Sequence, residues 1–324
     1  MFRRKERQTT LEDIENHEVV CPRCNNAVSF EGKHPLSVVV CSRCNKGHVF
    51  TPLQIGRFWL FKPLGGGGMG AVYESFIQGS DELAAVKILP ADQSQNPQLI
   101  QNLQQECRIM QEIGQHSCLT SYIESGYYDR EHFLATEYIE GERLDHRIER
   151  LKGIPEIDVI NIGLQLIQGL CHIYNHGYLY RDLKPQNIII NGDDKTYLFD
   201  FGICMPIVET YCDDSDIVQG SPLYISPERM VGEAEKVYSE IYSLGMVLYH
   251  CLKGKPYYEA KELNTLTRKH ARKLRLSNED VKMSDISPEL ANVLSRMIKR
   301  KASERYQNYF DVENDLMQIL VSRL

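Results

Sequence analysis

The sequence predicts an α+β fold with its strands gathered early in the chain, behind a small cysteine-containing module. Three segments, Phe58–Leu64, Val72–Phe76 and Leu83–Leu89, are rich in the β-branched and aromatic residues typical of strands. They are followed by Leu99–Ile113, where apolar residues recur at helical spacing. Ahead of them, two Cys-x-x-Cys pairs lie in a stretch too short to form its own hydrophobic core.

The bulk composition is that of an ordinary globular protein. The 324 residues are 42% hydrophobic and 25% charged, with a net charge of −7. This charge does not indicate a nucleic-acid-binding protein. The basic run at residues 3–5 leads into acidic residues rather than an apolar segment, and the longest apolar stretch, around Tyr242–Leu252, is too short to span a bilayer. We therefore expect a cytoplasmic protein without membrane contact, whose cysteines are reduced.

The cysteine pairs Cys21-x-x-Cys24 and Cys41-x-x-Cys44 are sixteen residues apart. Each pair can place two sulfurs on one side of a tight turn, and two such turns supply the four thiolates of a closed tetrahedral zinc site. Four ordinary buried cysteines are the alternative. Zinc contributes about 10–16 kcal/mol to the folding of comparable small peptides, which favours one structural zinc ion in a module similar to a zinc ribbon.

Within this module, Val28–Phe30 and Ser37–Val40 have the composition of short strands. We expect them to form one hairpin that carries a cysteine pair at each end. His34 and His48 are not expected to be ligands, because four cysteines suffice. Four thiolates and one zinc ion bring the net +2 of residues 1–56 close to neutral, which favours a protein partner or an intramolecular role over nucleic acid.

A glycine-rich segment follows the first predicted strand of the main domain. Gly65, Gly67 and Gly70 form the pattern G-x-G-x-x-G. Glycine allows a backbone to lie close over phosphate groups, where a Cβ atom would intrude. Dinucleotide-binding turns have the same glycines, but there the loop opens a helix, whereas here it leads into the strand Val72–Phe76. The pattern therefore predicts a hairpin that covers phosphates.

Lys87 lies in the middle of an apolar strand, where its ammonium group needs partners. Nucleotide phosphates and a carboxylate would provide them, although a lysine that reaches solvent from a surface strand is the alternative. The carboxylate should come from the helix Leu99–Ile113. Glu106 lies beside the apolar stripe of this helix, whereas Glu112 points away from it. We therefore expect Glu106 to pair with Lys87.

The run Tyr180-Arg181-Asp182-Leu183-Lys184-Pro185-Gln186-Asn187 is followed by Asp200-Phe201-Gly202. Phosphoryl transfer requires mainly positioning and charge neutralisation. Asp182 would accept the proton of an incoming hydroxyl group, and Lys184 would balance charge on the transferred phosphate. Asn187 and Asp200 would hold magnesium, brought together by a strand after the first residue and a strand before the second.

Together these motifs resemble the eukaryotic-type (Hanks-type) protein kinase domain, and Gly67-Gly68-Met69-Gly70 resembles the sequence common at this position in bacterial members. The resemblance covers residues 56–324. It implies the bilobal protein-kinase fold, with a β-rich N-lobe to about Thr136, a hinge at 137–139 and a helical C-lobe from about 140. Residues 1–18 are then an N-terminal extension and residues 19–55 the zinc ribbon.

The resemblance also implies how ATP is bound, with magnesium or manganese as the metal. The backbone of the hinge residues Glu137 and Ile139 would contact adenine, Val72 and Ala85 would lie against its ring, and Thr136 would be the gatekeeper. The partners implied are protein substrates.

Two features of the C-terminal part indicate a protein kinase of serine and threonine. The segment Gly220–Glu228 resembles the platform that receives the substrate peptide, and Glu228 would form a structural ion pair with Arg305. Lys184 together with Ser221 fits serine/threonine specificity, and autophosphorylation is expected. Small-molecule kinases usually lack this platform and are the second interpretation.

Three residues depart from the family pattern: Tyr180 stands where His is commonest, Gln186 where Glu is frequent and Glu240 where Asp is expected. None of them touches ATP, metal or the acceptor hydroxyl, so we expect an active enzyme rather than a pseudokinase scaffold displayed by the zinc module. The basic run at residues 268–273 would suit a nucleic-acid-associated factor as a further alternative, but a solvated helix face is the commoner meaning of such a run, and substrate docking is another.

The resemblance implies a site of activation as well. In kinases with an arginine at the position of Arg181, a phosphate on the activation loop commonly pairs with it. The loop here is Ile203–Gln219, and Thr210, Tyr211 and Ser215 are candidate phosphosites. We expect Thr210 or Ser215 to be the main switch, with the acidic residues of the loop giving basal activity. The alternative is that these acids are only solvated loop charges.

Overall fold

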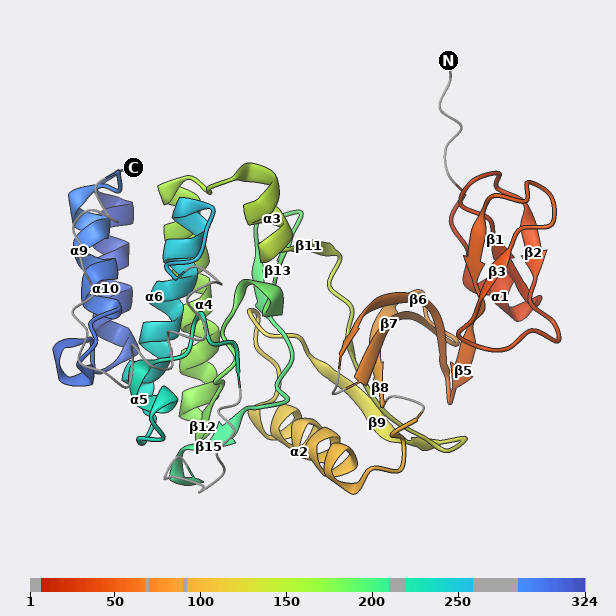
Figure 1. Cartoon of the computed structure of the whole chain (residues 1–324), viewed down its shortest axis with the longest axis horizontal. Coiled ribbons are helices and arrows are strands. Elements are labelled where there is room, and N and C mark those ends of the chain that lie inside the picture. The colour runs from red at the N-terminus through yellow and green to blue at the C-terminus, as the bar shows by residue number, and fades with distance from the viewer. Residues whose placement is uncertain (1–6, 68–69, 90–91, 210–219, 259–284, 324) are drawn as a thin grey trace, which may run out of the picture. The chain divides into compact units, whose positions relative to one another are not determined.

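The computed structural model describes residues 7–67, 70–89, 92–209, 220–258 and 285–323 (Figure 1). The chain divides into two compact units. Unit 1 comprises Met1–Cys107 and Ser121–Tyr138, and unit 2 comprises Arg108–Thr120 and Ile139–Leu324. Among the residues that the structure describes, every helix is either too short or too polar to span a bilayer. The basic run at residues 268–273 and the candidate phosphosites Thr210, Tyr211 and Ser215 lie outside the described residues.

Unit 1 begins with a small module that we call the ribbon, residues 7–50. Its helix α1 (Leu11–Glu15) starts at a capping box formed by Thr10 and Asp13. Four short strands follow: β1 (Glu18–Val20), β2 (Ala27–Ser29), β3 (Val38–Val40) and β4 (His48–Phe50).

The ribbon strands pair differently from the sequence prediction. β1 pairs with β2, and β3 pairs with β4, so the predicted single hairpin from residues 28–30 and 37–40 is wrong. Each Cys-x-x-Cys turn reverses the chain within its own hairpin. The turns are closed by bonds of 2.9 Å from Asn25 N to Cys21 O and from Asn45 N to Cys41 O, and both asparagines have positive φ, which Asn tolerates better than most residues.

The main sheet of unit 1 has six antiparallel strands in the order β5-β6-β7-β8-β10-β9. In chain order these strands are β5 (Leu53–Ile55), β6 (Phe58–Gly67), β7 (Gly70–Ile77), β8 (Leu83–Ile88), β9 (Tyr122–Tyr128) and β10 (Glu131–Glu137). One face is covered by a core that includes Phe58, Leu60, Val86 and Phe133. The edge strand β5 precedes the expected start of the kinase domain at residue 56, yet it pairs with β6.

The ribbon packs on this sheet. Its buried cluster contains Ile14, Phe30 and Val49, and the side chains of Trp59, Phe61 and Phe76 from β6 and β7 pack against it. The rings of Phe61 and Phe76 stack with centroids 4.3 Å apart. The ribbon and the sheet therefore share an apolar interface in addition to the backbone connection.

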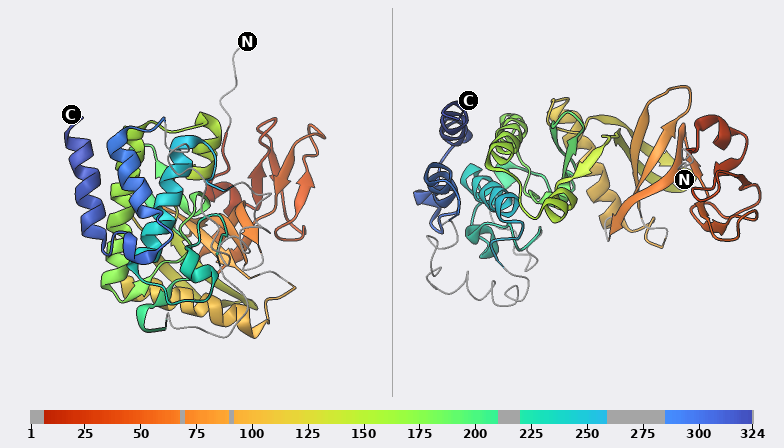
Figure 2. Two further views of the ribbon diagram at one scale, coloured as in Figure 1. Left: turned by 60° about the vertical axis from the view of Figure 1, so that its left-hand side comes forward. Right: turned by 90° about the horizontal axis from the view of Figure 1, so that it is seen from above.

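Unit 2 is mainly helical. The long helices α4 (Glu156–Asn175) and α6 (Val237–Lys253) contact each other, and α10 (Tyr309–Val321) and α9 (Pro288–Met297) flank them (Figure 2). Two shorter helices are α3 (Leu144–Leu151) and α5 (Pro227–Met230). Small sheets are formed by β11 (Gly141–Arg143), β13 (Ile188–Asn191) and β14 (Thr196–Leu198), and by β12 (Tyr178–Leu179) with β15 (Met205–Pro206).

The chain passes from one unit to the other after Cys107, within helix α2 (Pro97–Ile113), after Thr120, and after Tyr138, within the expected hinge. The strand-rich N-terminal region and the helical C-terminal region confirm the predicted α+β class.

Candidate active site and metal site

The glycine-rich segment forms the end of the β6–β7 hairpin. Gly65 lies opposite Val72, and Gly67 lies opposite Gly70. Gly70 has φ 137°, and a Cβ atom at this position would lie 2.5 Å from the carbonyl oxygen of Ile88. A larger residue cannot be accommodated there without a shift of β8, which explains the requirement for glycine.

Lys87 and Glu106 form a partly buried ion pair in unit 1. The Lys87 Nζ atom lies 2.8 Å from Glu106 Oε2, and the two side chains are 14% and 5% exposed. Lys87 extends from β8, where it is the cross-strand partner of Val72. Glu106 is on the buried face of α2, whereas Glu112 is exposed, as the helical spacing predicts. The pair gives the lysine the carboxylate partner that its position on an apolar strand requires.

The residues expected near adenine lie on neighbouring strands, with one exception. Ala85 on β8 and Thr136 on β10 are cross-strand partners, and the Thr136 hydroxyl donates a 3.4 Å hydrogen bond to the Ala85 carbonyl. The carboxylate of Glu137 accepts a 2.9 Å bond from the Ser121 hydroxyl, and its backbone N–H donates to the Ser121 carbonyl at 2.8 Å. Ile139 is buried and lies in unit 2.

Asp182 is held by two neighbours within the same loop. Its Oδ2 atom accepts hydrogen bonds from Lys184 Nζ at 2.7 Å and from Asn187 Nδ2 at 2.8 Å. Its Oδ1 atom is buried and accepts no hydrogen bond from any residue that the structure describes. The carboxylate is therefore oriented through one oxygen and retains acceptor capacity on the other.

Asn187 and Asp200 are brought together by β13 and β14. Ile188 lies opposite Leu198 in this pair, and the Phe199 N–H donates to the Asn187 carbonyl at 3.2 Å. Asp200 follows at once with φ 64°, an unusual conformation for a residue other than glycine. An amide oxygen and a carboxylate at adjoining ends of two paired strands are suitable ligands for magnesium.

Glu240 supports the loop that carries Asp182. It is 3% exposed, accepts the backbone N–H of Arg181 at 2.7 Å and accepts the Tyr309 hydroxyl at 2.9 Å. Burial raises the pKa of Glu240 above its usual value. The glutamate thus reaches the loop backbone despite its extra methylene, and its second oxygen is satisfied by Tyr309.

Tyr180 occupies the position where the family commonly has histidine. Its ring is completely buried and meets Phe201 edge-on, with centroids 5.7 Å apart. Its hydroxyl donates a 2.5 Å hydrogen bond to the carbonyl of Phe199. The tyrosine therefore links the loop of Asp182 to the segment of Asp200.

Sequence reasoning missed two residues that surround Arg181. Glu235 accepts hydrogen bonds from Arg181 Nε at 3.0 Å and Nη2 at 2.7 Å. Arg229 lies 3.4 Å from the same carboxylate and donates to the Arg181 carbonyl at 2.6 Å. Both residues belong to the segment between Pro227 and α6. No sequence pattern identifies them, because the need of the buried Arg181 for a counterion is apparent only in the folded structure.

The predicted ion pair between Glu228 and Arg305 is confirmed. Two parallel bonds join them, Nη1 to Oε1 at 2.7 Å and Nη2 to Oε2 at 2.8 Å. The Arg305 side chain is 0% exposed, and the Ser239 hydroxyl donates a further bond to Glu228. The pair fixes α5 to the segment before α10 in a bidentate geometry.

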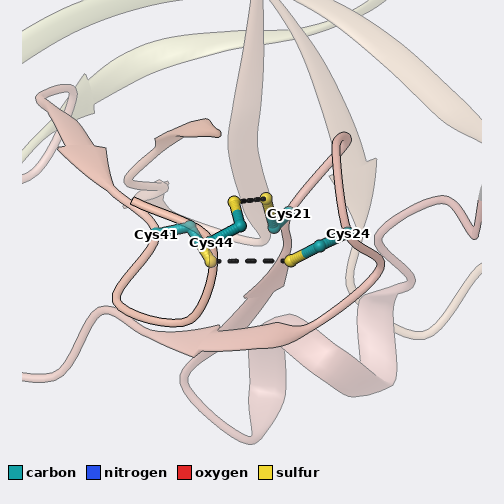
Figure 3. Close-up of side chains that lie close together, drawn as sticks. All are labelled: Cys21, Cys24, Cys41 and Cys44. Atoms are coloured by element: carbon teal, nitrogen blue, oxygen red, sulfur yellow. Dashed lines mark hydrogen bonds between the residues drawn. The ribbon is translucent and has the colours of Figure 1, made fainter. Parts of the chain in front are cut away.

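The four cysteines of the ribbon converge on one point (Figure 3). The Sγ atoms of Cys21 and Cys44 are 3.8 Å apart, those of Cys24 and Cys41 are 3.7 Å apart, and all four lie within 4.8 Å of one another. Zn–S bonds of about 2.3 Å at tetrahedral angles place sulfur atoms about 3.8 Å apart. The cluster therefore has the spacing of a tetrahedral zinc site, and His34 and His48 are not part of it.

Backbone N–H groups favour thiolates in this cluster. Those of Lys46 and Gly47 lower the pKa of Cys44 to about 6, and those of Cys44 and Arg43 lower the pKa of Cys41. The backbone N–H of Asn26 acts in the same direction on Cys24, but burial and the neighbouring cysteines outweigh it and raise the pKa of Cys24 to about 11. Gly47 has no space for a side chain, because its Cβ would lie 2.2 Å from Cys21 Sγ. The donor set and the crowding both fit a bound zinc ion.

The motifs, the two-unit architecture and the geometry of the loop at Asp182 define a protein kinase domain. The family model of the protein kinase domain matches residues 58–317, so the chain belongs to the protein kinase family. It is 30% identical over 270 residues to the serine/threonine-protein kinase PknH of Mycobacterium bovis, covering 82% of this chain and 44% of the relative.

Other bacterial relatives are similarly distant. The chain is 27% identical over 263 residues to the serine/threonine-protein kinase PrkC of Bacillus subtilis and 26% identical over 279 residues to the probable serine/threonine-protein kinase PknB of Lactococcus lactis. These matches cover 81% and 83% of this chain, and 40% and 43% of the relatives. The chain thus spans less than half the length of the curated relatives it matches.

Proposed function

We propose that this chain transfers the γ-phosphate of ATP to serine and threonine hydroxyls of proteins, including its own. The observation that carries the proposal is the Asp182 carboxylate, which Lys184 and Asn187 orient through Oδ2 while Oδ1 keeps its acceptor capacity. Such a carboxylate can accept the proton of an incoming hydroxyl group. Names of the bacterial relatives, all serine/threonine-protein kinases, support the acceptor class.

The other site residues have roles in positioning and charge neutralisation in this proposal. Lys87, oriented by Glu106, binds phosphate oxygens of ATP, and the hairpin of Gly65, Gly67 and Gly70 covers them through its backbone. Lys184 neutralises charge on the phosphate in transfer. Asn187 and Asp200 would hold magnesium or manganese, which would neutralise negative charge on the phosphate groups.

Substitution of Asp182 tests this mechanism. Asp182→Asn removes the proton acceptor but keeps the shape of the side chain, so turnover on a generic protein substrate should fall by about 10²–10⁴-fold. Lys87→Met should give a comparable loss, because positioning groups act as a unit. Asp193→Asn, on the exposed turn between β13 and β14, is the matched control. Wild-type turnover of Asp182→Asn in a radiolabel assay would refute the mechanism, and inactivity of the wild type would favour the pseudokinase alternative.

Phosphoamino-acid analysis tests the acceptor class. Incubation of the purified protein with labelled ATP and magnesium should yield phosphoserine and phosphothreonine on the kinase itself and on a protein substrate. Label found on phosphotyrosine alone, or only on small molecules, would contradict the proposed specificity.

We further propose that Cys21, Cys24, Cys41 and Cys44 hold one structural zinc ion. Elemental analysis should find one zinc per chain in the intact protein and none in Cys24→Ser. Cys171→Ser, at a cysteine outside the cluster, should retain the metal. A metal-free wild type would remove the basis for this site.

For the ribbon we propose an intramolecular role, with a protein partner as the second option. The packing of Trp59, Phe61 and Phe76 against the ribbon supports the intramolecular role. A cytoplasmic location is also part of the proposal, since a closed thiolate site and free cysteines suit a reducing compartment.

A further inference from the structure

The guanidinium group of Arg181 is already bound by a carboxylate of the same unit. Its Nε and Nη2 atoms donate to Glu235 Oε1 at 3.0 and 2.7 Å, and the two side chains are 12% and 8% exposed. Sequence reasoning expected this arginine to receive a phosphate from the activation loop. The partner seen here comes instead from the short segment between α5 and α6.

Arg181 is held at three points, and all three connect to the segment around Glu235. Its N–H donates to Glu240, its carbonyl accepts from Arg229 Nη1 at 2.6 Å, and its side chain binds Glu235. Arg181 has φ 71°, an unfavourable conformation that surrounding contacts must maintain. Because the next residue is Asp182, these contacts determine where the proposed proton acceptor lies.

The charges in this cluster require Glu235. Arg181 and Arg229 are like charges that meet in a buried region, and Arg229 is only 7% exposed. Burial, and to a lesser degree the neighbouring Arg181, lower the pKa of Arg229 to about 10. The carboxylates that face this pair are Glu235, Glu240 and Asp182. Glu240 binds the backbone of Arg181 and the hydroxyl of Tyr309. Asp182 binds Lys184 and Asn187. Glu235 is therefore the counterion that contacts both guanidinium groups.

We propose that Glu235 is a positioning residue for phosphoryl transfer, which acts through Arg181 and takes the place of an activation-loop phosphate as the counterion of this arginine. The inference rests on the proposed kinase function. To bind Arg181, a phosphate on Thr210 or Ser215 would have to displace the buried carboxylate of Glu235. Glu235 would then lose the Arg181 guanidinium as a partner. Activity of the wild type is therefore independent of phosphorylation at these positions.

Steady-state kinetics of three variants test the role of Glu235. Glu235→Gln keeps the shape and removes the charge, and we expect kcat to fall at least tenfold while KM for ATP changes less than twofold. Glu235→Asp should restore part of kcat, because it returns the carboxylate. Glu233→Gln, an exposed neighbour, should behave as the wild type. Equal kcat for Glu235→Gln and Glu233→Gln would overturn the proposal.

Phosphatase treatment separates a role of Glu235 as counterion of Arg181 from a role in folding stability alone. Only the counterion role predicts how activity depends on the loop phosphate. Wild type treated with phosphatase, and the double variant Thr210→Ala/Ser215→Ala, should each keep at least half of the untreated activity. Residual activity of Glu235→Gln should fall further after phosphatase, because a loop phosphate can take the place that the lost carboxylate leaves beside Arg181. A tenfold loss in the phosphatase-treated wild type would overturn the proposal, even if Glu235→Gln proves unstable by thermal melting. Neither result bears on Asp182→Asn, whose retained activity would instead refute the kinase mechanism.

Discussion

Single buried carboxylates hold the backbone of unit 2 in place around the loop of Asp182. Glu228 binds Arg305, Glu235 binds Arg181, and Glu240 binds the N–H of Arg181 and the hydroxyl of Tyr309. Each carboxylate is less than 9% exposed, so a loss of its partner would leave an uncompensated charge in a region of low dielectric constant. The positions of catalytic groups therefore depend on residues that do not touch substrate.

The Glu228–Arg305 pair predicts a stability loss that depends on pH. Burial alone would raise the pKa of Glu228, but the hydrogen bonds from Arg305 outweigh it and hold the pKa below its usual value. This stabilisation is complete above the unfolded pKa, about 4.3, and is lost as the pH falls through the lower folded value. At pH 7, Arg305→Met should lower the free energy of unfolding by about 3–5 kcal/mol, because it leaves Glu228 buried and unpaired.

Urea denaturation at pH 7 and at pH 4 checks this expectation. The difference in stability between wild type and Arg305→Met should be largest at pH 7 and should shrink at pH 4, where Glu228 in the variant is protonated. Arg150→Gln, which breaks an exposed pair with Glu142, should change stability little at either pH. A pH-independent difference would show that packing, rather than the charge of Glu228, stabilises this contact.

The catalytic residues in local motifs were predictable from the sequence, whereas the partner of Arg181, which comes from a distant part of the sequence, was not. Lys87, Asp182, Asn187 and Asp200 belong to short patterns whose residue types and spacing indicate their chemistry. The helical spacing also distinguished Glu106 from Glu112. Glu235 belongs to no pattern, because its contact with Arg181 arises only when the turn between α5 and α6 folds back on the loop of Asp182.

At the scale of secondary structure, the strand that directly follows the ribbon extends the kinase sheet. β5 is the edge strand next to β6, with Leu53 opposite Leu60 and Ile55 opposite Phe58. Leu36 and Leu53 pack against the core of this sheet. Strands β6, β7 and β8 were predictable from their composition, but this continuation beyond residue 56 was not, since a three-residue strand leaves almost no periodic signal.

A chain that starts at Gly56 should therefore be less stable than the intact protein. It loses β5 and exposes Trp59, Phe61 and Phe76, which now pack against the ribbon. We expect the free energy of unfolding to fall by about 2–4 kcal/mol, since three aromatic side chains lose apolar neighbours. Thermal melting of both chains measures the loss.

The triple substitution of these aromatic residues by Ser in the shortened chain is the control. It removes the newly exposed apolar surface and should improve solubility without restoring the lost strand. Melting temperatures that agree for the intact and the Gly56 chains would show that the ribbon does not support the sheet. The shortened chain should retain turnover while folded, because the ribbon supplies no catalytic group.

At the scale of the whole chain, each unit has its own stabilising elements. In unit 1 the proposed zinc site adds to the apolar interface between the ribbon and the sheet, whereas unit 2 is stabilised by its packed helices and the buried Glu228–Arg305 pair. Zinc binding contributes folding free energy directly to a module of this size. Removal of the metal should consequently act on one unit rather than on the whole chain.

Hydrogen exchange in the presence of a zinc chelator shows whether removal of the metal destabilises unit 1 alone or the whole chain. After chelation, amides of β1–β4 should lose most of their protection, and amides of β6 and β7, which carry Trp59, Phe61 and Phe76, should lose part of it. Amides in the buried segments of α4 and α6 should keep theirs, because these helices pack on helices and strands of unit 2. The chelator should have no effect on exchange in Cys24→Ser, which already lacks the site.

Loss of protection confined to β1–β4 would mean that the ribbon folds on the sheet without stabilising it. Equal loss in α4 and α6 would mean that the units unfold together, and the module would then contribute to the stability of the entire kinase.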